Sequence, residues 1–558
     1  MKELLNRINF QRLIVSFCFL AVCISTQRIQ TTAWNTGIIE FSRNILGVLM
    51  AVIMFTHYKW QDFVKYKLLY IIWSVLGSIL CIVFFLIAIN NSEEFLIAST
   101  IVTAIGIFLM GYCILHVIIS IFVEKCRPKI FFQLCVIWIV MMLLMIFSRS
   151  DYLWPECYFV LFLCYYMTKQ TSRQRENVLW GMVDGIIMGF VLIQAHSLVF
   201  RPYDRVRYYG NFCNPNHNCM FLCMCLAAIL AKLLYIFKVN KKWLIKFFYF
   251  VLAGACYSFI CMTICRSGYL TTIVVTIFFL IAYCRIRGKK VFFRMALLLV
   301  SIFVISFPLT YIAVRYIPTV HPHVLFYFQE GYSEQRVHSW DDRNSEKYVS
   351  FEELVQSIFG RIQKTSYLYE QFIGTDQQKQ GDDELKIAAI EDYFPMEGFR
   401  YLTENIEGAE VVVGGEGVEK ETNPNKIPML TDREANNAFL VRYTIYKWYF
   451  DHLSLRGSPY DEQGFQLLEK HWIQDTHNIY LDYGINFGWP VMLLFTVFIW
   501  WGVVRLIRRG WKERDAQTWA CLFIVLVPPI FGLLEFSWGA GMISTVAFYF
   551  SFKEIFIS

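Results

Sequence analysis

Long apolar segments separated by short polar ones run along most of the chain, from near Arg12 to Phe550. A helix of about 20 mostly apolar residues crosses the hydrocarbon core of a bilayer, so this pattern predicts about fourteen transmembrane helices. The first resembles a signal peptide in charge and length, but no small-residue cleavage site follows it, and we interpret it as an uncleaved anchor. The predicted spans are approximately 12–26, 42–58, 68–90, 96–123, 130–147, 153–168, 178–200, 217–237, 247–265, 268–284, 295–314, 488–506, 516–535 and 539–555.

One long polar segment, residues 315–487, interrupts this pattern. The chain therefore divides into a first membrane region at 1–314, an insert at 315–487 and a second membrane region at 488–558. Apolar segments of this length satisfy their backbone groups in a bilayer as helices. The predicted fold class is an all-α polytopic membrane protein with one large insert.

The composition agrees with this interpretation. Apolar residues make up 57% of the chain and charged residues 17%, whereas soluble domains are near half apolar and a quarter charged. These values exclude a disordered chain, a coiled coil and an ordinary cytosolic enzyme. The lipid bilayer is therefore the first expected partner.

The insert has features of a separate folding unit. None of the 17 cysteines lies in it, so it has no disulfide framework. A helix is predicted from Asp432 to Leu455. Its period places four aromatic side chains on one face. They are Phe439, Tyr443, Tyr446 and Phe450.

The charge is divided between these regions. The chain has 51 basic and 44 acidic residues. The insert holds 16 of the basic and 29 of the acidic residues, so its net charge is −13, and the net charge of the remainder is +20. An acidic insert on a basic membrane region does not indicate a nucleic-acid partner. Every second loop between spans is basic, which predicts that both termini are cytoplasmic and that the insert is extracytoplasmic. The basic loops are 59–67, 125–129, 169–175, 238–246, 285–294 and 505–514.

Some arginine residues on the opposite side break this rule. Arg205 and Arg207 follow the seventh span, and Arg266 follows the ninth. Arginine near hydrocarbon is unfavourable unless it is paired or hydrated. One interpretation is local pairing, for example with Asp204, together with snorkelling to lipid headgroups. The other is an anion-binding site at the outer membrane face, because the planar guanidinium suits phosphate oxygens.

Three short segments on this side carry residues suited to chemistry. Residues 205–218 contain turn residues that open a span, and the N–H groups of a helix start favour an anion. Residues 265–268 form a tight connection that leaves Arg266 at the membrane surface. Residues 475–490 contain His477, where the insert returns to the membrane. Histidine is the usual general base near neutral pH, although an isolated histidine beside a bilayer is more often structural.

Hard-cation sites are an alternative that the insert offers. His321 and His323, the pair Asp341 and Asp342, and the acidic run 382–384 contain groups that bind Mg²⁺ or Ca²⁺ in other settings. A solvated acidic surface explains them more simply. We therefore expect neither a metal nor another cofactor.

The order of the three segments is more informative than any one of them. Arg-x-x-Gly and Asn-Pro-Asn open a span, Arg-Ser-Gly follows one hairpin later, and His-Asn-x-Tyr-Leu precedes a late span after a long outer loop. Over residues 178–506 the chain resembles the O-antigen ligase and O-antigen polymerase superfamily of bacterial membrane glycosyltransferases. The resemblance implies a GT-C-like fold and a metal-independent, inverting glycosyl transfer. The donor would be an undecaprenyl-pyrophosphate-linked glycan at the outer face of the cytoplasmic membrane.

The resemblance also implies roles for residues of this chain. Arg207 matches the arginine that contacts the pyrophosphate, with Arg205 as the near alternative. Arg266 matches a second arginine, and Arg442 matches a loop arginine more loosely. His477 matches the loop histidine, which would accept the proton of the attacking hydroxyl. Two or three arginines can stabilise the charge that grows on the pyrophosphate without a metal.

Two further residues complete the predicted site. Asn478 is expected to orient His477 or the substrate, and Glu535 is expected to contact a sugar or an arginine. Cys265 departs from the resemblance, because many relatives have serine there, and the insert is longer than usual. The acceptor stays open between another lipid-linked glycan, a lipid core and a protein hydroxyl, which leaves both a polymerase and a ligase.

A lipid-linked glycan flippase or another polytopic transporter is the alternative function. A transporter is expected to place ionisable residues near the middle of its spans. The sequence suggests that the middle of the spans is nearly free of charge, while charges gather at one face. This distribution favours an enzyme. A ligand sensor, the third possibility, leaves Arg205, Arg207 and Arg266 unexplained.

Overall fold

The fold is that of a computed structural model of the chain, and it is mostly helical. The described residues are 9–25, 36–89, 94–125, 132–150, 154–200, 207, 208, 210, 212, 215–239, 242–288, 291–317, 354–359, 438–459, 462–468, 471–473, 476–535 and 542–556. The helices of the first membrane region are α2 (Phe10–Ser25), α3 (Thr36–Phe55), α4 (Trp60–Lys65), α5 (Lys67–Ile89), α6 (Glu94–Ile118) with the π-helical turn η1 (Ile119–Val123), α7 (Phe132–Ile146), α8 (Trp154–Met167), α9 (Ser172–Phe200), α10 (Pro215–Lys238), α11 (Trp243–Met262), α12 (Arg266–Arg287) and α13 (Phe292–Tyr316).

The later part of the chain adds a small layer and three more long helices. These elements are α19 (Ala438–Asp451), β1 (Phe465–Leu468), β2 (His471–Ile473), α20 (Ile479–Phe487), α21 (Trp489–Glu513), α22 (Ala516–Phe531) and α23 (Ile543–Phe556). The two strands pair antiparallel, with Phe465 opposite Ile473. The all-α prediction therefore omits one short hairpin.

Each of the fourteen predicted spans contains one of these helices. Among the described residues, eight helical segments are both long and apolar enough to cross a membrane. Four shorter apolar helices, α2, the last part of α3, α7 and α22, fall below that length. The structure thus supports a multi-pass membrane protein. The eight segments are Lys67–Ile89, Ser99–Val123, Ser172–Leu198, Pro215–Lys238, Trp243–Met262, Arg266–Arg287, Phe292–Val314 and Trp489–Glu513.

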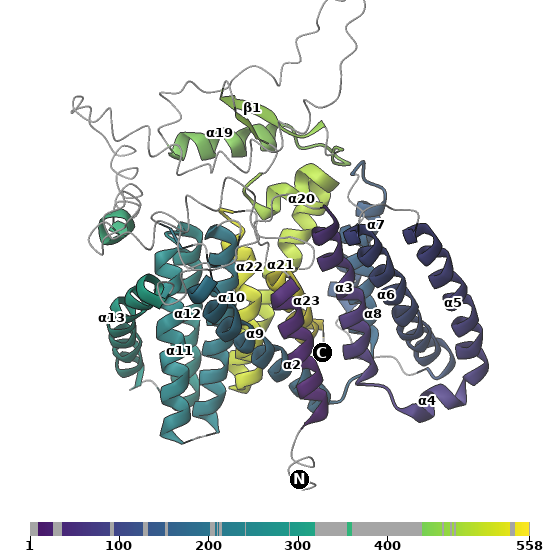
Figure 1. Ribbon diagram of the computed structural model, residues 1–558, viewed down its shortest axis with the longest axis horizontal. Helices are drawn as coiled ribbons and strands as arrows, with labels where there is room; N and C mark the ends of the chain where they lie inside the picture. Colours follow the sequence, from purple (N-terminus) through teal and green to yellow (C-terminus); the bar gives the residue numbers. More distant parts are fainter. Residues whose placement is uncertain are drawn as a thin grey trace, which may run out of the picture.

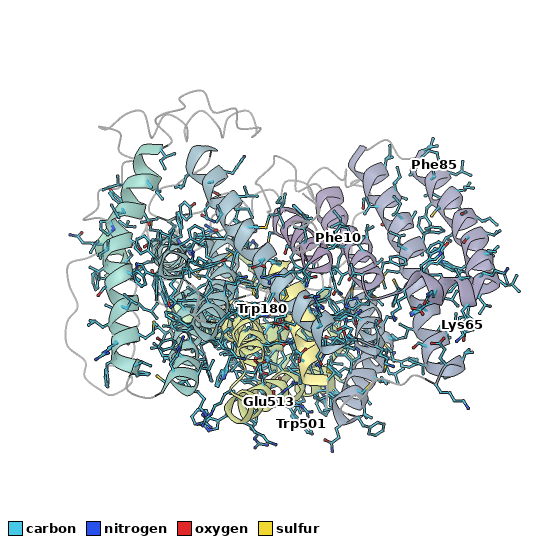
Figure 2. All side chains as sticks on the ribbon, turned by 90° about the horizontal axis from the view of Figure 1, so that it is seen from below. Phe10, Lys65, Phe85, Trp180, Trp501 and Glu513 are labelled. Carbon is cyan, nitrogen blue, oxygen red and sulfur yellow. The ribbon has the colours of Figure 1, made fainter. Side chains whose placement is uncertain are left out.

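The long helices differ greatly in burial. The most apolar window of α10 is 94% buried, whereas that of α5 is 11% buried and is suited to lipid contact on most of its surface. Figure 1 shows α9, α10 and α21 to α23 in the middle of the bundle, with α5 at one side and α13 at the other. Seen from below, Trp180 lies inside the bundle and Phe85 at its rim (Figure 2). The centre of the bundle is therefore formed by α10 and its neighbours.

The first helix, α2, packs closely on α9 because a stripe of glycines lets the two backbones approach. A Cβ atom on Gly181 would lie 2.8 Å from the carbonyl oxygen of Arg12, and one on Gly189 would lie 2.8 Å from Cys23. Gly185, between them, meets the backbone of Ser16 at still closer range. Small residues at intervals of four are a common means of close helix packing in membranes. The stripe fixes α2 in the bundle.

Partly buried charges support the same contact. Asp184 of α9 forms an ion pair with Arg12 of α2, and its other oxygen lies 2.5 Å from Nζ of Lys232 of α10. Charges persist in apolar surroundings when they are paired in this way. Asp184 is thus one charge inside the span predicted at 178–200. Its charge is neutralised within the bundle.

The basic loops meet at one end of the bundle. Nζ of Lys238 lies 2.7 Å from Asp515, and Arg285 donates to the carbonyl of Trp511 at 3.1 Å. Asn9 donates to Asn177, and Glu554 near the last described residue pairs with Arg175, so both described ends of the chain also lie there. We call this the basic end. Residues that follow α9 and α11, and those that precede α10, α12 and α21, lie at the opposite end.

The small layer at this opposite end contains α19, the hairpin and α20 (Figure 1). On the aromatic face of α19, Tyr443 and Phe450 are 52% and 63% exposed. A separate hydrophobic cluster holds the layer together instead. From α19 it contains Val441, Ile445, Trp448 and Tyr449, and from the hairpin and α20 it contains Phe465, Leu467, Ile473 and Ile485.

Candidate functional site

His477 lies directly before α20, at the end of the bundle opposite the basic one. Its φ angle is +50°, a left-handed conformation that is uncommon for a residue with a side chain. The next residue, Asn478, caps α20: its Oδ1 accepts from the N–H groups of Tyr480 at 2.9 Å and Leu481 at 3.1 Å. The Thr476 hydroxyl donates to the Asn478 carbonyl at 2.8 Å. These bonds hold His477 in its strained conformation.

The loop that follows α22 packs against this segment. Nδ2 of Asn478 donates to the carbonyl of Leu533 at 3.0 Å, and the N–H of Ile479 donates to that of Gly532 at 2.8 Å. The Tyr446 hydroxyl of α19 lies 3.1 Å from the His477 carbonyl and 3.2 Å from the Leu533 carbonyl. Residues 532–535 and 476–479 are therefore held together as one unit.

Glu535 joins the two charged residues of this unit. Its Oε1 accepts from Nη2 of Arg442 at 2.8 Å, and its Oε2 lies 3.7 Å from Nδ1 of His477. Arg442 also donates to the carbonyl of Leu534. Burial opposes ionisation of Glu535, but the positive charge of Arg442 and the contact with His477 prevail and lower its pKa to about 2. Glu535 is therefore a carboxylate at any physiological pH.

Arg207 belongs to a second loop, between α9 and α10. Its Nε donates to the carbonyl of Thr263 at 2.9 Å, and its Nη2 donates to Oδ1 of Asn216 at 2.6 Å. The next residue, Tyr208, donates its N–H to the carbonyl of Met262 at 2.9 Å. Within the described residues Nη1 of Arg207 has no partner. The two bonds thus fix the guanidinium against the end of α11.

Arg266 is the first residue of α12 and follows a strained turn. Ile264 has a φ angle of +49°, which is rare for a β-branched residue. Cys265 precedes α12 as its N-cap without a side-chain bond, and Gly268 is so close to Cys219 of α10 that a side chain there would meet its sulfur. Strained backbone is maintained where the surrounding packing imposes it, and it gathers at functional sites.

The two halves of the site share one buried neighbour, the Cys265 thiol. Burial raises its pKa most, the neighbouring thiol of Cys219 and the negative charge of Glu535 raise it further, and the positive charge of Arg207 lowers it. Packing explains this proximity, because α22 contacts both α10 and α12 and ends four residues before Glu535. The structure therefore brings Arg207, Cys265 and Glu535 to one end of the bundle, and Glu535 carries the link to His477.

Four of the residues that the sequence singled out lie in one cluster in the structure, namely His477, Asn478, Arg442 and Glu535. The guanidinium of Arg442 bonds to the Glu535 carboxylate and to the Leu534 carbonyl. Arg266 is the first residue of α12, at the same end of the bundle as this cluster. Arg205 lies outside the described residues, as do the acidic groups considered as cation sites. Sequence analysis missed Tyr446 as a contact of this cluster, although its place on the aromatic stripe, one turn after Arg442, was a usable signal.

No family model matches the chain, and no curated protein or solved structure shows a significant match to it.

Proposed function

We propose that the protein is a membrane glycosyltransferase that transfers or polymerises an undecaprenyl-pyrophosphate-linked glycan. The observation that supports this most directly is the cluster of His477, Glu535 and Arg442 at the same end of the bundle as Arg207 and Arg266. A base and a set of cations on one side of a membrane region suit a reaction that deprotonates a hydroxyl and releases a pyrophosphate. The resemblance of residues 178–506 to O-antigen ligases and polymerases points the same way.

In this proposal the acceptor oxygen attacks the anomeric carbon of the donor sugar. The bond between that carbon and the pyrophosphate oxygen breaks, and the pyrophosphate leaves with the electron pair. Nε2 of His477 takes the proton of the acceptor hydroxyl, because Nδ1 faces the Glu535 carboxylate at 3.7 Å. Attack opposite the leaving group inverts the anomeric centre.

The cations divide into two roles. Arg207 and Arg266 bind the pyrophosphate and stabilise its growing negative charge. Arg442 is paired with Glu535 at 2.8 Å and therefore positions that carboxylate rather than the donor. Glu535 in turn holds the His477 ring so that Nε2 faces the acceptor. The lipid tail of such a donor would lie beside the apolar helices, which places the reaction at the membrane boundary.

The remaining features of the proposal concern topology. We propose fourteen spans in a GT-C-like arrangement, with both termini cytoplasmic and residues 315–487 outside the cytoplasmic membrane. The basic end would then face the cytoplasm, as the bias of lysine and arginine requires. Single cysteines placed at Lys242 and Asp451, with the accessible native thiols removed, test this. Labelling of the first but not the second by an impermeant reagent in intact cells would reverse the orientation.

The experiment for the activity measures donor turnover and donor binding separately in purified variants. His477→Gln should lose turnover and still bind donor, whereas Arg207→Ala and Arg266→Ala should lose donor binding. Arg508→Ala is the matched control, because Arg508 is an exposed arginine at the basic end. Normal turnover in His477→Gln and in both arginine variants would exclude the proposed chemistry.

A transporter is the second candidate, and one observation favours it. Asp184 is half-buried near the middle of α9 between two cations, a place where carriers keep ionisable residues. Asp184→Asn distinguishes the two. Loss of glycan translocation by a correctly assembled variant, with no transferase activity in wild type, would support the carrier.

A further inference from the structure

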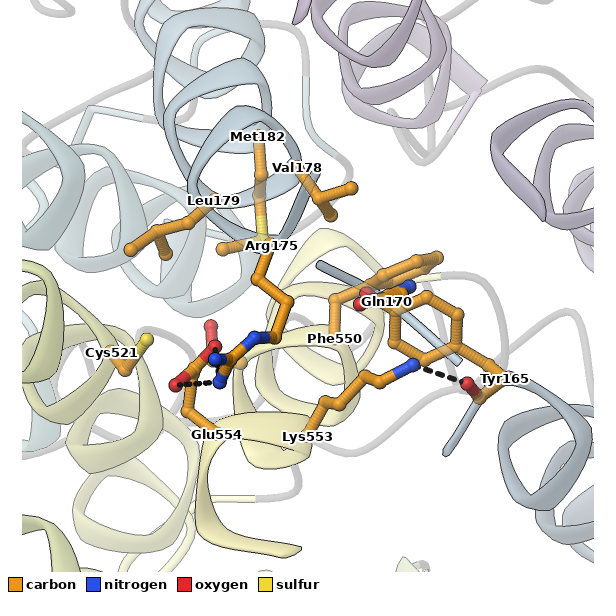
Figure 3. Close-up of a pocket in the computed structure, with 11 residues that line it drawn as sticks. Tyr165, Gln170, Arg175, Val178, Leu179, Met182, Cys521, Phe550, Lys553 and Glu554 are labelled. Carbon is orange, nitrogen blue, oxygen red and sulfur yellow. Dashed lines mark hydrogen bonds and ion pairs between the residues drawn. The ribbon is translucent and has the colours of Figure 1, made fainter. Parts of the chain in front are cut away.

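A cavity with charged groups in a largely apolar wall lies at the basic end of the bundle, at the opposite end from the candidate site. It is lined by residues of α8, α9, α22 and α23 and of the α8–α9 loop, and it contains about 280 Å³ of space when its open side is counted. Its enclosed part is only large enough for a water-sized group. Figure 3 shows Arg175, Lys553 and Glu554 around this space. Nothing in the proposed transferase chemistry uses these residues.

The charges that line the cavity do not balance. Nη1 of Arg175 lies 3.3 Å from Oε2 of Glu554, so one cation and one carboxylate form a pair. The second cation, Lys553, is 4% exposed and donates only to backbone carbonyls, those of Tyr165 at 2.7 Å and Thr168 at 2.9 Å. The wall therefore carries one basic group more than it has carboxylates.

A third cation nearby does not change this balance. Arg509 lies 3.5 Å from Glu554, but its Nε also lies 2.9 Å from a carboxylate oxygen of Glu513, which compensates it. Excess positive charge in a largely buried position is unfavourable unless an anion or water is present. An anion in the cavity would remove that cost.

Three hydrogen-bond donors of the wall are unused within the part of the chain that the structure describes. They are the hydroxyl of Ser551, a residue that is 2% exposed, Nε of Arg175 and Nε2 of Gln170. One acceptor of the same wall, Oε1 of Gln170, is also without a partner there. Buried polar groups are nearly always hydrogen-bonded, so missing partners indicate a bound group. Donors outnumber the acceptor, and an oxyanion provides the acceptors that they require.

We propose that this cavity is a binding site for a phosphate group. One phosphate oxygen enters the enclosed part and accepts hydrogen bonds from Ser551 Oγ and Arg175 Nε, while the rest of the group occupies the open side near Lys553. A phosphodiester carries one negative charge, which would pair with the extra basic group of the wall, Lys553. The group comes either from a phospholipid headgroup or from free phosphate.

The test uses the purified full-length protein and measures its thermal unfolding midpoint. Inorganic phosphate is titrated in detergent against potassium chloride of equal ionic strength, and phosphatidylglycerol is compared with diacylglycerol, which lacks the phosphate. A saturable rise of the midpoint with inorganic phosphate indicates a free-anion site, and a rise with phosphatidylglycerol alone indicates a headgroup site. Either result supports the proposal.

Two variants assign the binding to this cavity. Ser551→Ala removes one unused donor, and Arg175→Lys keeps the charge but removes Nε. Each should weaken phosphate binding by about tenfold, the loss expected for one hydrogen bond to a charged group. Ser544→Ala, which removes another buried hydroxyl of α23 outside the cavity, should leave binding unchanged. The proposal is overturned if neither probe stabilises wild type, as expected for a cavity that holds water only, or if Ser544→Ala weakens binding as much as Ser551→Ala.

Discussion

Glu535 faces His477 with one carboxylate oxygen, at 3.7 Å from Nδ1, and binds Arg442 with the other, at 2.8 Å. The two partners come from separate elements, since Arg442 lies on α19 and His477 precedes α20. The carboxylate therefore connects α19 of the small layer to the loop after α22. Its charge is fixed by this arrangement, and it sets which nitrogen of the His477 ring faces outward.

Glu535→Gln tests this relationship. The variant keeps the shape of the side chain and loses the negative charge that orients the ring. We expect the rate of glycan transfer to fall about tenfold to a hundredfold, a part of the 10²–10⁴ that a general base contributes. Glu535→Asp should recover part of the rate. The measurement is kcat and KM for the lipid-linked donor.

A change in KM alone would contradict a positioning role for Glu535 and would indicate direct contact with the donor. Glu513→Gln is the matched control, because Glu513 is a paired carboxylate at the basic end. Its transfer rate should equal that of wild type.

The low pKa of Glu535 predicts how the cluster responds to acid. The pKa is near 2 in the folded protein against an ordinary value of 4.5, so ionised Glu535 stabilises the folded state above pH 4.5. That contribution declines as the pH falls toward 2. In acid unfolding, wild type should lose stability over this range more steeply than Glu535→Gln. Identical acid profiles would show that the ion pair contributes nothing to folding.

Asn478 has two functions that substitutions can separate. Asn478→Asp keeps the oxygen that caps α20 but loses the donor to the Leu533 carbonyl, whereas Asn478→Ala loses both. We expect a loss of about 1 kcal/mol for the cap, so the alanine variant should be the less stable one by roughly that amount. Denaturant unfolding in detergent measures it. Equal stabilities would mean that the cap does not matter here.

The contact between α2 and α9 should not accept a larger side chain. Gly185→Leu would place a side chain against the Ser16 backbone, and overpacking of this kind costs about 1–3 kcal/mol. Met188→Leu, on an exposed part of the same helix, is the control with similar volume. The yield of folded protein and its thermal midpoint should fall only for the glycine variant. An unchanged midpoint would place the two helices further apart.

Much of the helical arrangement follows from local pattern. The apolar segments alone locate fourteen helices, because each must satisfy its own backbone bonds in a bilayer. For α19 the period places the aromatic side chains on one face but does not show which face packs, and the structure buries Val441 and Ile445 while Tyr443 and Phe450 are exposed. Exposed aromatic side chains and buried aliphatic ones have the same helical period. Only the neighbouring hairpin decides which set is covered.

The candidate site shows a similar limit. Residue type and order were enough to select His477, Arg207 and Arg266, but the link through Glu535 joins residues that are 58 positions apart in the chain. The strain at Ile264 was also invisible, because a β-branched residue disfavours a left-handed conformation, and histidine adopts one too rarely for the sequence to predict it at His477. Long-range packing imposes both features, and local sequence does not encode them.

The ion pair between Arg12 and Asp184 also has a consequence for biosynthesis, since its partners are 172 residues apart. At a synthesis rate of 5–20 residues per second, Arg12 is made on the order of 10 to 30 s before its counter-charge. During this interval α2 has neither the carboxylate nor the glycine stripe of α9 to hold it. The nascent helix must then wait at the membrane with its charge in the interface, accessible to the insertion machinery, and its final place in the bundle can be reached only after more than five further helices have been inserted.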